Sequence, residues 1–508
     1  MDARDPAARV ADLAGDLMPG GQIASYIGGA WVAGRGEPVA LTDPATGRPL
    51  LAYADGGATA ADAALDAAGR GFAAWQSLTA SARGRIVWAI GQEVRREAGR
   101  LAEIEAITVG KPIRDARAEV GRVAEMFEYY AGWCDKLHGE VIPVPTTHVN
   151  LTTREPFGAV VQITPWNAPI FTAGWQIAPA IAAGNAVVLK PSELTPVTSL
   201  LLAVLAQRAG APDGLVNVLA GLGATAGARA VAHPSTRLVV FVGSRETGAR
   251  IVEAAARNVT PAILELGGKS ANIVFADADL DRAILGAQAA IFSGAGQSCV
   301  AGSRLLVERP IHAAFVARLA EAAGRIPVGA PLDDATQIGP INNRRQWEKI
   351  QGMVAAGAAA GADVVAGGGP PAALASSGGF YFSPTILDRV APAMEIAREE
   401  VFGPVLAVMP FDTEEEAVAL ANASAYGLAG AVWTRDGGRG HRIAKAVRAG
   451  TFWINGYKTI SVLSPFGGFN QSGYGRSSGL EALRSYTTTK SIWVETAAST
   501  PVTFGYAG

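Results

Sequence analysis

Apolar side chains recur with two different periods along this chain, and the change from one period to the other predicts its elements. Between residues 60 and 133 they recur at steps of three and four, as in Val120, Val123 and Phe127, which is the spacing of one face of an α-helix. We therefore expect helices with one buried face, interrupted near Thr79 and at Gly110-Lys-Pro112. The first fifty residues carry short apolar runs and turn residues, and predict short strands.

From residue 158 onward, short runs rich in Val and Ile alternate with helical stretches. This alternation predicts parallel sheets covered by helices on both faces, an α/β fold. The first block has expected strands at 158–164, 186–190, 216–220 and 237–242. Its expected helices are one from about Phe171, one at 195–209, one between the last two strands and one that starts at Ser244. A second block follows Glu265, with expected strands at 272–276, 304–308, 429–434 and 450–454, and helices at 279–292, 311–324, 342–361 and 413–422.

Two further segments read as strands that lie outside these blocks. Residues 136–157 contain prolines and alternating positions, and residues 486–495 alternate near the C-terminus. Neither has an evident partner in its own domain, and unpaired strand edges are hazards that proteins cover. We expect these segments to pair between subunits of a dimer or a dimer of dimers.

Composition limits the function classes that remain. A chain of 508 residues exceeds what one hydrophobic core supports, so two or more domains are expected. The formal net charge of −2 provides no field for gathering nucleic acid or a membrane surface, so we expect a small-molecule partner. Only two cysteines occur and no apolar signal core follows Met1, which predicts a reducing, cytoplasmic location. The five histidines show no metal-ligand spacing, so no metal is expected.

One uncharged segment, residues 156–189, is long enough to cross a bilayer, but prolines and glycines interrupt it. We interpret it as strand, turn, helix, turn and strand, and expect no membrane association.

Three segments carry candidate chemistry. Cys299 lies among glycines and small residues, where the backbone can turn and bring an amide close to a reacting atom. Glu265 begins a Glu-Leu-Gly-Gly stretch, and Asn167 follows Pro165-Trp. Together these residues offer a nucleophile, a base and an amide for an oxyanion. Each has an ordinary alternative when read alone, namely a buried cysteine, a surface carboxylate and a turn residue.

Two other segments match known motifs, but the residues around them do not fit the corresponding sites. The Gly475-Arg-Ser-Ser-Gly479 segment fits a serine hydrolase pattern, but no strand precedes it and no histidine follows it in the chain. Gly268-Lys-Ser270 ends like a phosphate loop, but Ile263 stands where that loop needs its first glycine.

Seven motifs in order make the chain resemble the aldehyde dehydrogenase superfamily from about Gly21 to Glu495. They are Pro165-Trp-Asn167, Lys190-Pro-Ser-Glu193, Gly243-Ser244 with Thr247-Gly248, Glu265-Leu-Gly-Gly268, Gly296-Gln-Ser-Cys299, Glu400-Val-Phe-Gly-Pro404 and Pro465-Phe-Gly-Gly468. The resemblance implies a Rossmann-type NAD-binding domain at 1–135 and 156–264 and an α/β catalytic domain at 265–473. It also implies a bridging β arm and tail for oligomerisation at 136–155 and 474–508.

The same resemblance implies NAD(P)-dependent oxidation of an aldehyde to a carboxylic acid. Cys299 would attack the carbonyl as thiolate, and the Asn167 amide and the Cys299 backbone N–H would hold the oxyanion. After hydride transfer, Glu265 would take a proton from the water that hydrolyses the thioester.

The resemblance further implies the residues around the cofactor and the aldehyde. NAD, or more weakly NADP, would contact Thr164, Pro165, Trp166, Lys190, Ser192, Glu193, Gly243, Ser244, Thr247, Leu266, Gly267, Glu400 and Phe402. The aldehyde tunnel would be lined by Phe171, Trp175, Tyr457, Ile460 and Phe466, which favours an uncharged aliphatic or aromatic aldehyde.

Several alternatives stay open at this point. Lys458, interpreted as a solvated loop lysine, would select an aldehyde that carries a carboxylate if its ammonium turned inward. A CoA-acylating enzyme is disfavoured by Glu265 in the position of the base, and a catalytically inactive nucleotide-binding protein by the presence of all three catalytic candidates. The chain departs from common family patterns at Ala168, Val242, Ser477 and the loop 457–463. Of these, Ser477 stands where a glutamate often follows Gly-Arg, so an auxiliary proton relay there is in doubt.

Overall fold

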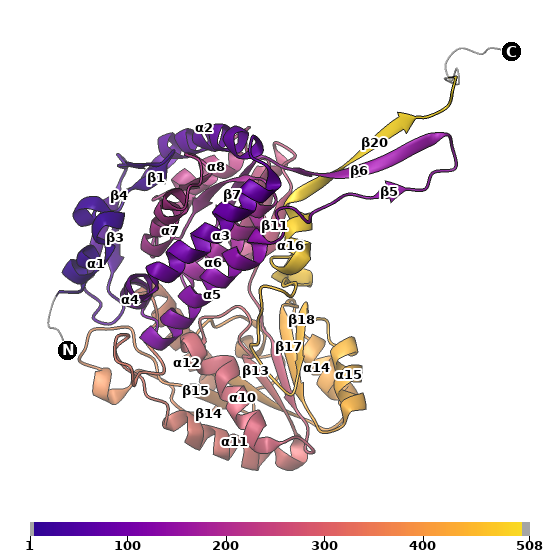
Figure 1. Cartoon of the computed structure of the whole chain (residues 1–508). Coiled ribbons are helices and arrows are strands. Elements are labelled where there is room, and N and C mark those ends of the chain that lie inside the picture. The colour runs from indigo at the N-terminus through magenta and orange to yellow at the C-terminus, as the bar shows by residue number, and fades with distance from the viewer. Residues whose placement is uncertain (1–4, 500–508) are drawn as a thin grey trace.

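The computed structural model describes residues 5–499 and contains two large sheets and a projecting arm (Figure 1). Residues 1–4 of the expected first domain and residues 500–508 of the expected tail lie outside the described residues. One hydrophobic core surrounds the eight-stranded sheet, and a second surrounds the seven-stranded sheet. The predicted α/β class is confirmed, while the domain boundaries stay a prediction.

The eight-stranded sheet has the order β19-β11-β10-β7-β8-β9-β1-β2. Its strands from β11 to β9 run parallel, whereas β1, β2 and β19 pair in antiparallel fashion at the two edges. The strands are β1 (Ser25–Ile27), β2 (Ala30–Val32), β7 (Ala159–Ile163), β8 (Ala186–Lys190), β9 (Val216–Val218), β10 (Leu238–Val242), β11 (Ala262–Glu265) and β19 (Gly473–Tyr474). Every residue of β8 is buried, as expected for a strand covered on both faces.

Helices cover this sheet, and their ends follow the expected capping chemistry. The helices are α2 (Gly57–Gln76), α3 (Ala80–Arg96), α4 (Ala98–Val109), α5 (Ile113–Ala131), α6 (Pro169–Ala182), α7 (Val197–Arg208), α8 (Ala228–Ala232) and α9 (Arg245–Ala256). The Thr79 hydroxyl caps α3, and Gly110 ends α4 with φ of 86°, so both predicted interruptions are confirmed. The face of α5 that includes Val120, Val123 and Phe127 is buried as predicted.

The seven-stranded sheet has the order β14-β15-β16-β13-β12-β17-β18, and only β14 is antiparallel to its neighbour. Its strands are β12 (Ala271–Val274), β13 (Arg304–Glu308), β14 (Asp363–Ala366), β15 (Thr385–Asp388), β16 (Val405–Phe411), β17 (Ala429–Trp433) and β18 (Thr451–Ile454). The helices of this part are α10 (Leu280–Phe292), α11 (Arg309–Gly324), α12 (Arg344–Ala359), α13 (Glu395–Arg398), α14 (Glu414–Asn422) and α15 (Gly437–Ala446).

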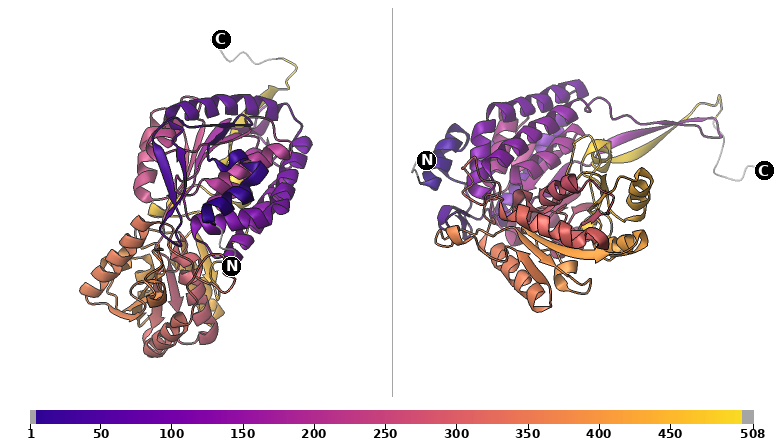
Figure 2. Two further views of the ribbon diagram at one scale, coloured as in Figure 1. Left: turned by 90° about the vertical axis from the view of Figure 1, so that its left-hand side faces the viewer. Right: turned by 90° about the horizontal axis from the view of Figure 1, so that it is seen from below.

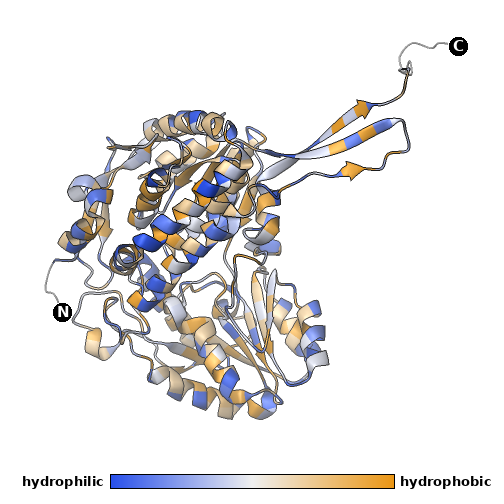
Figure 3. Cartoon of the chain, viewed as in Figure 1, coloured by the Kyte–Doolittle hydropathy of each residue, from blue (hydrophilic) through white to orange (hydrophobic). Residues whose placement is uncertain are grey.

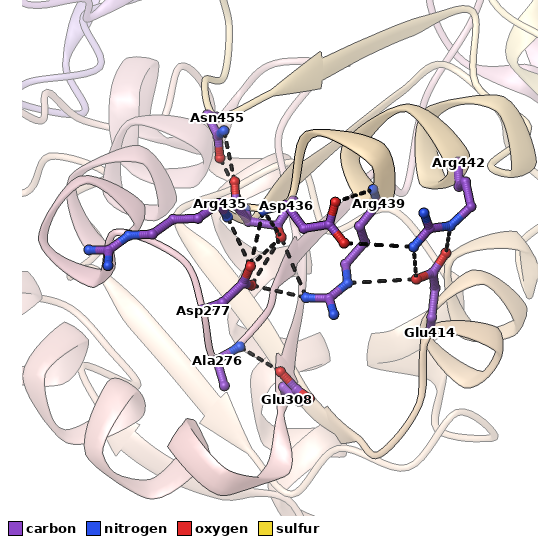
Figure 4. A network of polar contacts seen from close by, with 10 residues as sticks. Ala276, Asp277, Glu308, Glu414, Arg435, Asp436, Arg439, Arg442 and Asn455 are labelled. Atoms are coloured by element: carbon purple, nitrogen blue, oxygen red, sulfur yellow. Dashed lines mark hydrogen bonds and ion pairs between the residues drawn. The ribbon is translucent and has the colours of Figure 1, made fainter.

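Four helices were not predicted from the sequence: α1 (Pro6–Ala14), α13, α15 and α16 (Gly479–Ser485). The α15 segment begins Gly-Gly-Arg-Gly, which has low helix propensity, but a polar network fixes its start (Figure 4). Asp277 accepts hydrogen bonds from the backbone of Arg435 and Asp436 at 3.1 Å and pairs with Arg439 at 3.0 Å. Tertiary contacts therefore override the local preference.

A three-stranded sheet with the order β20-β6-β5 extends away from the body of the protein (Figure 2). It consists of β5 (Val141–Ile142), β6 (His148–Pro156) and β20 (Thr487–Glu495), and β6 pairs with β20 along its whole length. The two segments that lacked an evident partner in their own domains pair with each other within the chain, while pairing between subunits stays a prediction. A separate hairpin joins β3 (Pro38–Thr42) and β4 (Pro49–Ala54). Among the described residues, no helix combines the length and apolar character needed to cross a bilayer.

Candidate active site

The Cys299 loop connects α10 to β13 and turns sharply at its start. Gly294, Ala295 and Gly296 have φ of 66°, 55° and 67°, in the left-handed region that glycine adopts most readily. A Cβ on Gly296 would lie 2.0 Å from the carbonyl oxygen of Gly403, so only glycine fits this position. The loop holds Cys299 half-buried with its thiol free.

The eight-stranded sheet brings the other candidate segments to one edge. Ile163 of β7 pairs with Lys190 of β8 and Phe241 of β10, and Val242 pairs with Glu265 of β11. The residues that follow these strands therefore meet at the carboxyl ends of parallel strands, where open sheets bind ligands. Thr164, Gly243 and Gly267 lie in this group, although they are far apart in the sequence.

Asn167 lies just before α6, and its side chain reaches the Cys299 loop. Its Nδ2 donates a hydrogen bond to the carbonyl oxygen of Gln297 at 2.8 Å. The Gln297 side chain in turn accepts from the backbone N–H of Asn342 at 2.9 Å, which braces the loop from the other side. An amide nitrogen has two hydrogens, so Asn167 keeps a second donor for a ligand.

Glu265 stands at the end of β11, and the segment that follows it touches the same loop. A Cβ on Gly268 would lie 2.5 Å from the Cys299 carbonyl oxygen, so glycine permits this close approach. Glu265 is only 5 % exposed, and within residues 5–499 neither carboxylate oxygen has a hydrogen-bond partner of good geometry. Burial raises the pKa of Glu265 to about 8, although the nearby Ser477 hydroxyl and Arg476 act to lower it.

The Cys299 thiol shares this electrostatic environment. Burial raises the pKa of Cys299 to about 12, and the charges of Glu400 and Glu265 raise it further. Two negative charges so close together are unfavourable, so the thiolate forms more readily when Glu265 is protonated. A strongly shifted acid beside a nucleophile is typical of catalytic sites.

The cofactor candidates form a cradle whose chemistry fits a dinucleotide. The buried Lys190 ammonium lies 2.7 Å from the Glu193 carboxylate at the end of β8. The Ser244 hydroxyl caps α9 by accepting from the Thr247 N–H, as the predicted helix start requires, and a helix N-terminus favours a phosphate. The other members are small or turn residues around these groups: Pro165, Ser192, Gly243 and Leu266.

Glu400 lies on the other side of the candidate cofactor site, in the loop between α13 and β16. Its carboxylate accepts from the Gly268 N–H at 2.9 Å, and a Cβ on Gly267 would lie 2.5 Å from it. Phe402 has φ of 57°, an uncommon conformation for an aromatic residue, and its ring packs edge-on against Trp166 at 5.4 Å. Such strained positions cluster at functional sites.

Three of the five tunnel candidates pack together. The rings of Phe171 and Trp175 lie 4.8 Å apart, and those of Trp175 and Phe466 lie 5.3 Å apart. Ile460 packs against the same hydrophobic core. Tyr457 is not part of this aromatic group, because its ring packs on Trp453 at 4.8 Å and lies against Gly302.

Ser477 lies between this aromatic group and Glu265. The sequence did not predict this role for Ser477. Its backbone N–H donates to Phe466 at 2.8 Å, and its carbonyl accepts from the Trp175 indole. Its hydroxyl lies beside Glu265 and accepts from Gln176 at 3.4 Å. A neutral hydrogen-bonding group thus occupies the position where the expected glutamate is missing.

Lys458 is the second residue whose placement differs from the prediction. The interpretation as a solvated loop lysine is wrong, because the side chain is partly buried and its ammonium donates to Ser293 Oγ at 2.8 Å. The sequence alone cannot predict where so long a side chain places its ammonium. The ammonium reaches solvent or turns into the protein according to the residues around it.

Comparison with known proteins agrees with this geometry. Residues 31–492 match the family described as "Aldehyde dehydrogenase family". The betaine aldehyde dehydrogenase of Bacillus subtilis (strain 168) is 42 % identical over 476 residues, which cover 93 % of this chain and 97 % of that protein. Human retinal dehydrogenase 2 is 40 % identical and covers 91 % of this chain and 89 % of its own length.

Solved structures of similar proteins have the same fold. PnpE from Pseudomonas sp. WBC-3 superposes with a TM-score of 0.93 at 41 % identity, covering 95 % of this chain and 99 % of its own. A betaine aldehyde dehydrogenase variant from Staphylococcus aureus, solved in complex with NAD+, has a TM-score of 0.92 at 37 % identity, with 95 % and 99 % coverage. The predicted resemblance is confirmed: the chain belongs to the aldehyde dehydrogenase family and is an oxidoreductase that acts on aldehydes.

Proposed function

We propose that the chain oxidises an aldehyde to a carboxylic acid with NAD, and that Cys299, Asn167 and Glu265 carry out the chemistry. The observation that carries this proposal is the convergence of three distant segments. Asn167 donates to the Cys299 loop at 2.8 Å, and the Glu265 segment packs against the same loop at Gly268. A nucleophile, an oxyanion donor and a base in one place are what acyl chemistry requires.

Cys299 loses its thiol proton to water and attacks the carbonyl carbon as thiolate, and the carbonyl oxygen becomes an oxyanion. The free hydrogen of Asn167 Nδ2 and the Cys299 backbone N–H stabilise this oxyanion. Because Asn167 is already held by Gln297, the donor is oriented before charge develops, and little reorganisation accompanies the reaction. Loss of hydride from the carbon then leaves a thioester on Cys299.

NAD, when bound, supplies the acceptor for the hydride. Lys190 and Glu193 would bind the adenosine ribose, Ser244 and the N-terminus of α9 would bind the pyrophosphate, and Glu400 would bind the nicotinamide ribose. The remaining contacts come from Thr164, Pro165, Trp166, Ser192, Gly243, Thr247, Leu266, Gly267 and Phe402. This assignment makes residues 1–135 and 156–264 the NAD-binding domain and residues 265–473 the catalytic domain.

Glu265 completes the cycle by taking a proton from water, which attacks the thioester and breaks the carbon–sulfur bond. A base with a pKa of about 8 is close to physiological pH, where general-base catalysis is efficient. The Ser477 hydroxyl orients the carboxylate in place of an auxiliary carboxylate relay. Transfer of the acyl group to CoA would need no such base, so water is the acceptor.

The arm formed by β5, β6 and β20 supports assembly into a homodimer or a dimer of dimers. Residues of high hydropathy lie along its strands (Figure 3), and the exposed apolar side chains there include Val141 at 71 % and Trp493 at 55 % exposure. A projecting sheet with free edges and apolar side chains is covered by another subunit. Residues 136–155 and 474–508 thus form the oligomerisation region, and a monodisperse monomer in light scattering at micromolar concentration would contradict this.

We place the protein in a reducing compartment, the cytoplasm. Cys134 and Cys299 are both free, and the thiol of Cys299 must remain reduced to react.

The experiment that tests the chemistry follows NADH absorbance with purified protein, NAD and a panel of aldehydes. Wild type is expected to oxidise the aldehydes to acids without CoA. An absolute requirement for CoA would overturn the hydrolytic step, and the absence of NADH formation with every aldehyde would overturn the proposal as a whole.

A further inference from the structure

Lys458 lies in the loop between β18 and Phe466 and is held against the turn that leads to Cys299. Its ammonium donates to Ser293 Oγ at 2.8 Å and to Ser293 O at 3.3 Å. Ser293 is the first residue of the turn Ser293–Gly296, six positions before the nucleophile. Lys458 has φ of 60°, which is uncommon for a residue with a side chain and which the surrounding loop must hold in place.

The charge of Lys458 has no paired anion in the described part of the chain. No carboxylate among residues 5–499 lies within 4 Å of its Nζ, and Asp115, which acts on this charge from α5, pairs with Arg114 at 3.2 Å. An ammonium has three hydrogens, of which Ser293 takes two, so one donor is left. Both Ser293 acceptors are uncharged oxygen atoms, and neither neutralises the cation.

Burial lowers the pKa of Lys458 to about 8, while Cys299 and Asp115 act to raise it. The side chain is therefore mostly charged at pH 7. A partly buried cation without an anion is costly, and a ligand that brings a carboxylate would remove this cost.

We infer that Lys458 binds a carboxylate at the far end of the aldehyde, so that the preferred substrates are oxo acids rather than uncharged aldehydes. This inference rests on the proposed function, because Cys299 must hold the aldehyde end of the same molecule. The methylene groups between the two ends span the distance from Cys299 to Lys458, which are close enough for the Cys299 charge to act on the ammonium. This substrate class replaces the uncharged aldehyde expected from the sequence, which depended on a solvated Lys458.

A second role for the same cation makes a different prediction. If Lys458 served only to stabilise the Cys299 thiolate, every aldehyde would depend on it equally. If it binds a carboxylate, the dependence is confined to oxo acids and passes through an optimum of chain length, because the substrate must span two fixed positions.

The test compares matched pairs of the same length, from butanal with succinic semialdehyde to octanal with 8-oxooctanoate, by kcat/KM with NAD. We expect wild type to prefer the oxo acid of the best length by about tenfold or more, as a charge-assisted hydrogen bond provides. Lys458→Met should remove most of this preference. Lys445→Met, at an exposed position on α15, is the matched control and should leave the ratio unchanged.

Binding provides a second measurement that does not depend on turnover. Hexanoate should raise the thermal transition of the wild-type protein with NADH more than hexan-1-ol does, and Lys458→Met should lose this difference. Two results would overturn the inference and leave the proposed function intact. One is a wild-type preference for alkanals, and the other is an equal fall in kcat/KM for the alkanal and the oxo acid in Lys458→Met. Absence of oxidation of any aldehyde would overturn the proposed function and this inference with it.

Discussion

Replacing Glu265 by Gln is expected to stabilise the protein in a manner that depends on pH. The carboxyl is buried, and burial raises its pKa from 4.5 to about 8. At pH 7 the folded protein therefore keeps this group mostly neutral, whereas the unfolded chain ionises it. Gln has nearly the same shape and no proton to lose, and its amide can donate to Ser477 Oγ.

The magnitude follows from the two pKa values. Because the folded pKa is raised, the contribution of Glu265 to stability is fully present below pH 4.5 and is lost as the pH rises towards 8. At about 1.4 kcal/mol per pH unit, the loss is roughly 3 kcal/mol at pH 7 and about 5 kcal/mol above pH 8. With an unfolding entropy of roughly 2 cal/mol/K per residue, 3 kcal/mol corresponds to a Tm change of about 3 °C for this chain.

The assay is thermal unfolding of wild type and Glu265→Gln between pH 5 and pH 8.5, because other titrating groups cancel in the difference. The Tm of Glu265→Gln should exceed that of wild type by little at pH 5 and by progressively more towards pH 8. Glu253→Gln, on the exposed side of α9, is the control and should show no comparable pH-dependent gain. A Tm difference that does not change with pH would mean that Glu265 is not a buried neutral acid.

Three further substitutions test separate parts of the site. Cys299→Ala should abolish oxidation while NAD still binds in calorimetry, and activity near that of wild type would exclude a covalent intermediate. Asn167→Ala should lower kcat by about 100-fold to 1,000-fold with a much smaller change in KM, as expected for loss of an oxyanion donor, and an effect confined to KM would contradict this role. Glu193→Ser should narrow the preference for NAD mainly by improving NADP, because a carboxylate repels the 2′-phosphate while Lys190 attracts it. Equal kcat/KM for the two cofactors in wild type would show that Glu193 does not contact the ribose.

The sequence predicted the elements that depend on local patterns. The buried strands β8 and β13 fall where runs of apolar residues predict them, and the Ser244 cap falls at the expected start of α9. The site motifs could be recognised because seven of them occur in the order found in the aldehyde dehydrogenase superfamily.

What the sequence could not predict depends on contacts between distant segments. The short strand β11 was not predicted, since only four residues form it and its position is fixed by β10 and β19. The pairing of β6 with β20 joins residues more than 300 positions apart, and no local pattern encodes that register.

The same limit applies within the candidate site. The brace from Asn342 through Gln297 to Asn167 crosses three segments, and each residue read alone suggests only a polar loop. The orientation of Lys458 is decided by its contact with Ser293, which the sequence does not show. From the sequence alone, a preference for aldehydes with a carboxylate followed only if the ammonium turned inward.

The central claim is that Cys299 forms a thioester that Glu265 helps water to cleave. The most direct measurement mixes Glu265→Gln with NAD and an oxidisable aldehyde, follows NADH by stopped flow, and determines the mass of the peptide that contains Cys299. The account predicts a burst of about one NADH per site, slow turnover afterwards, and an acyl group on Cys299. Steady turnover without a burst, together with an unmodified Cys299, would contradict it.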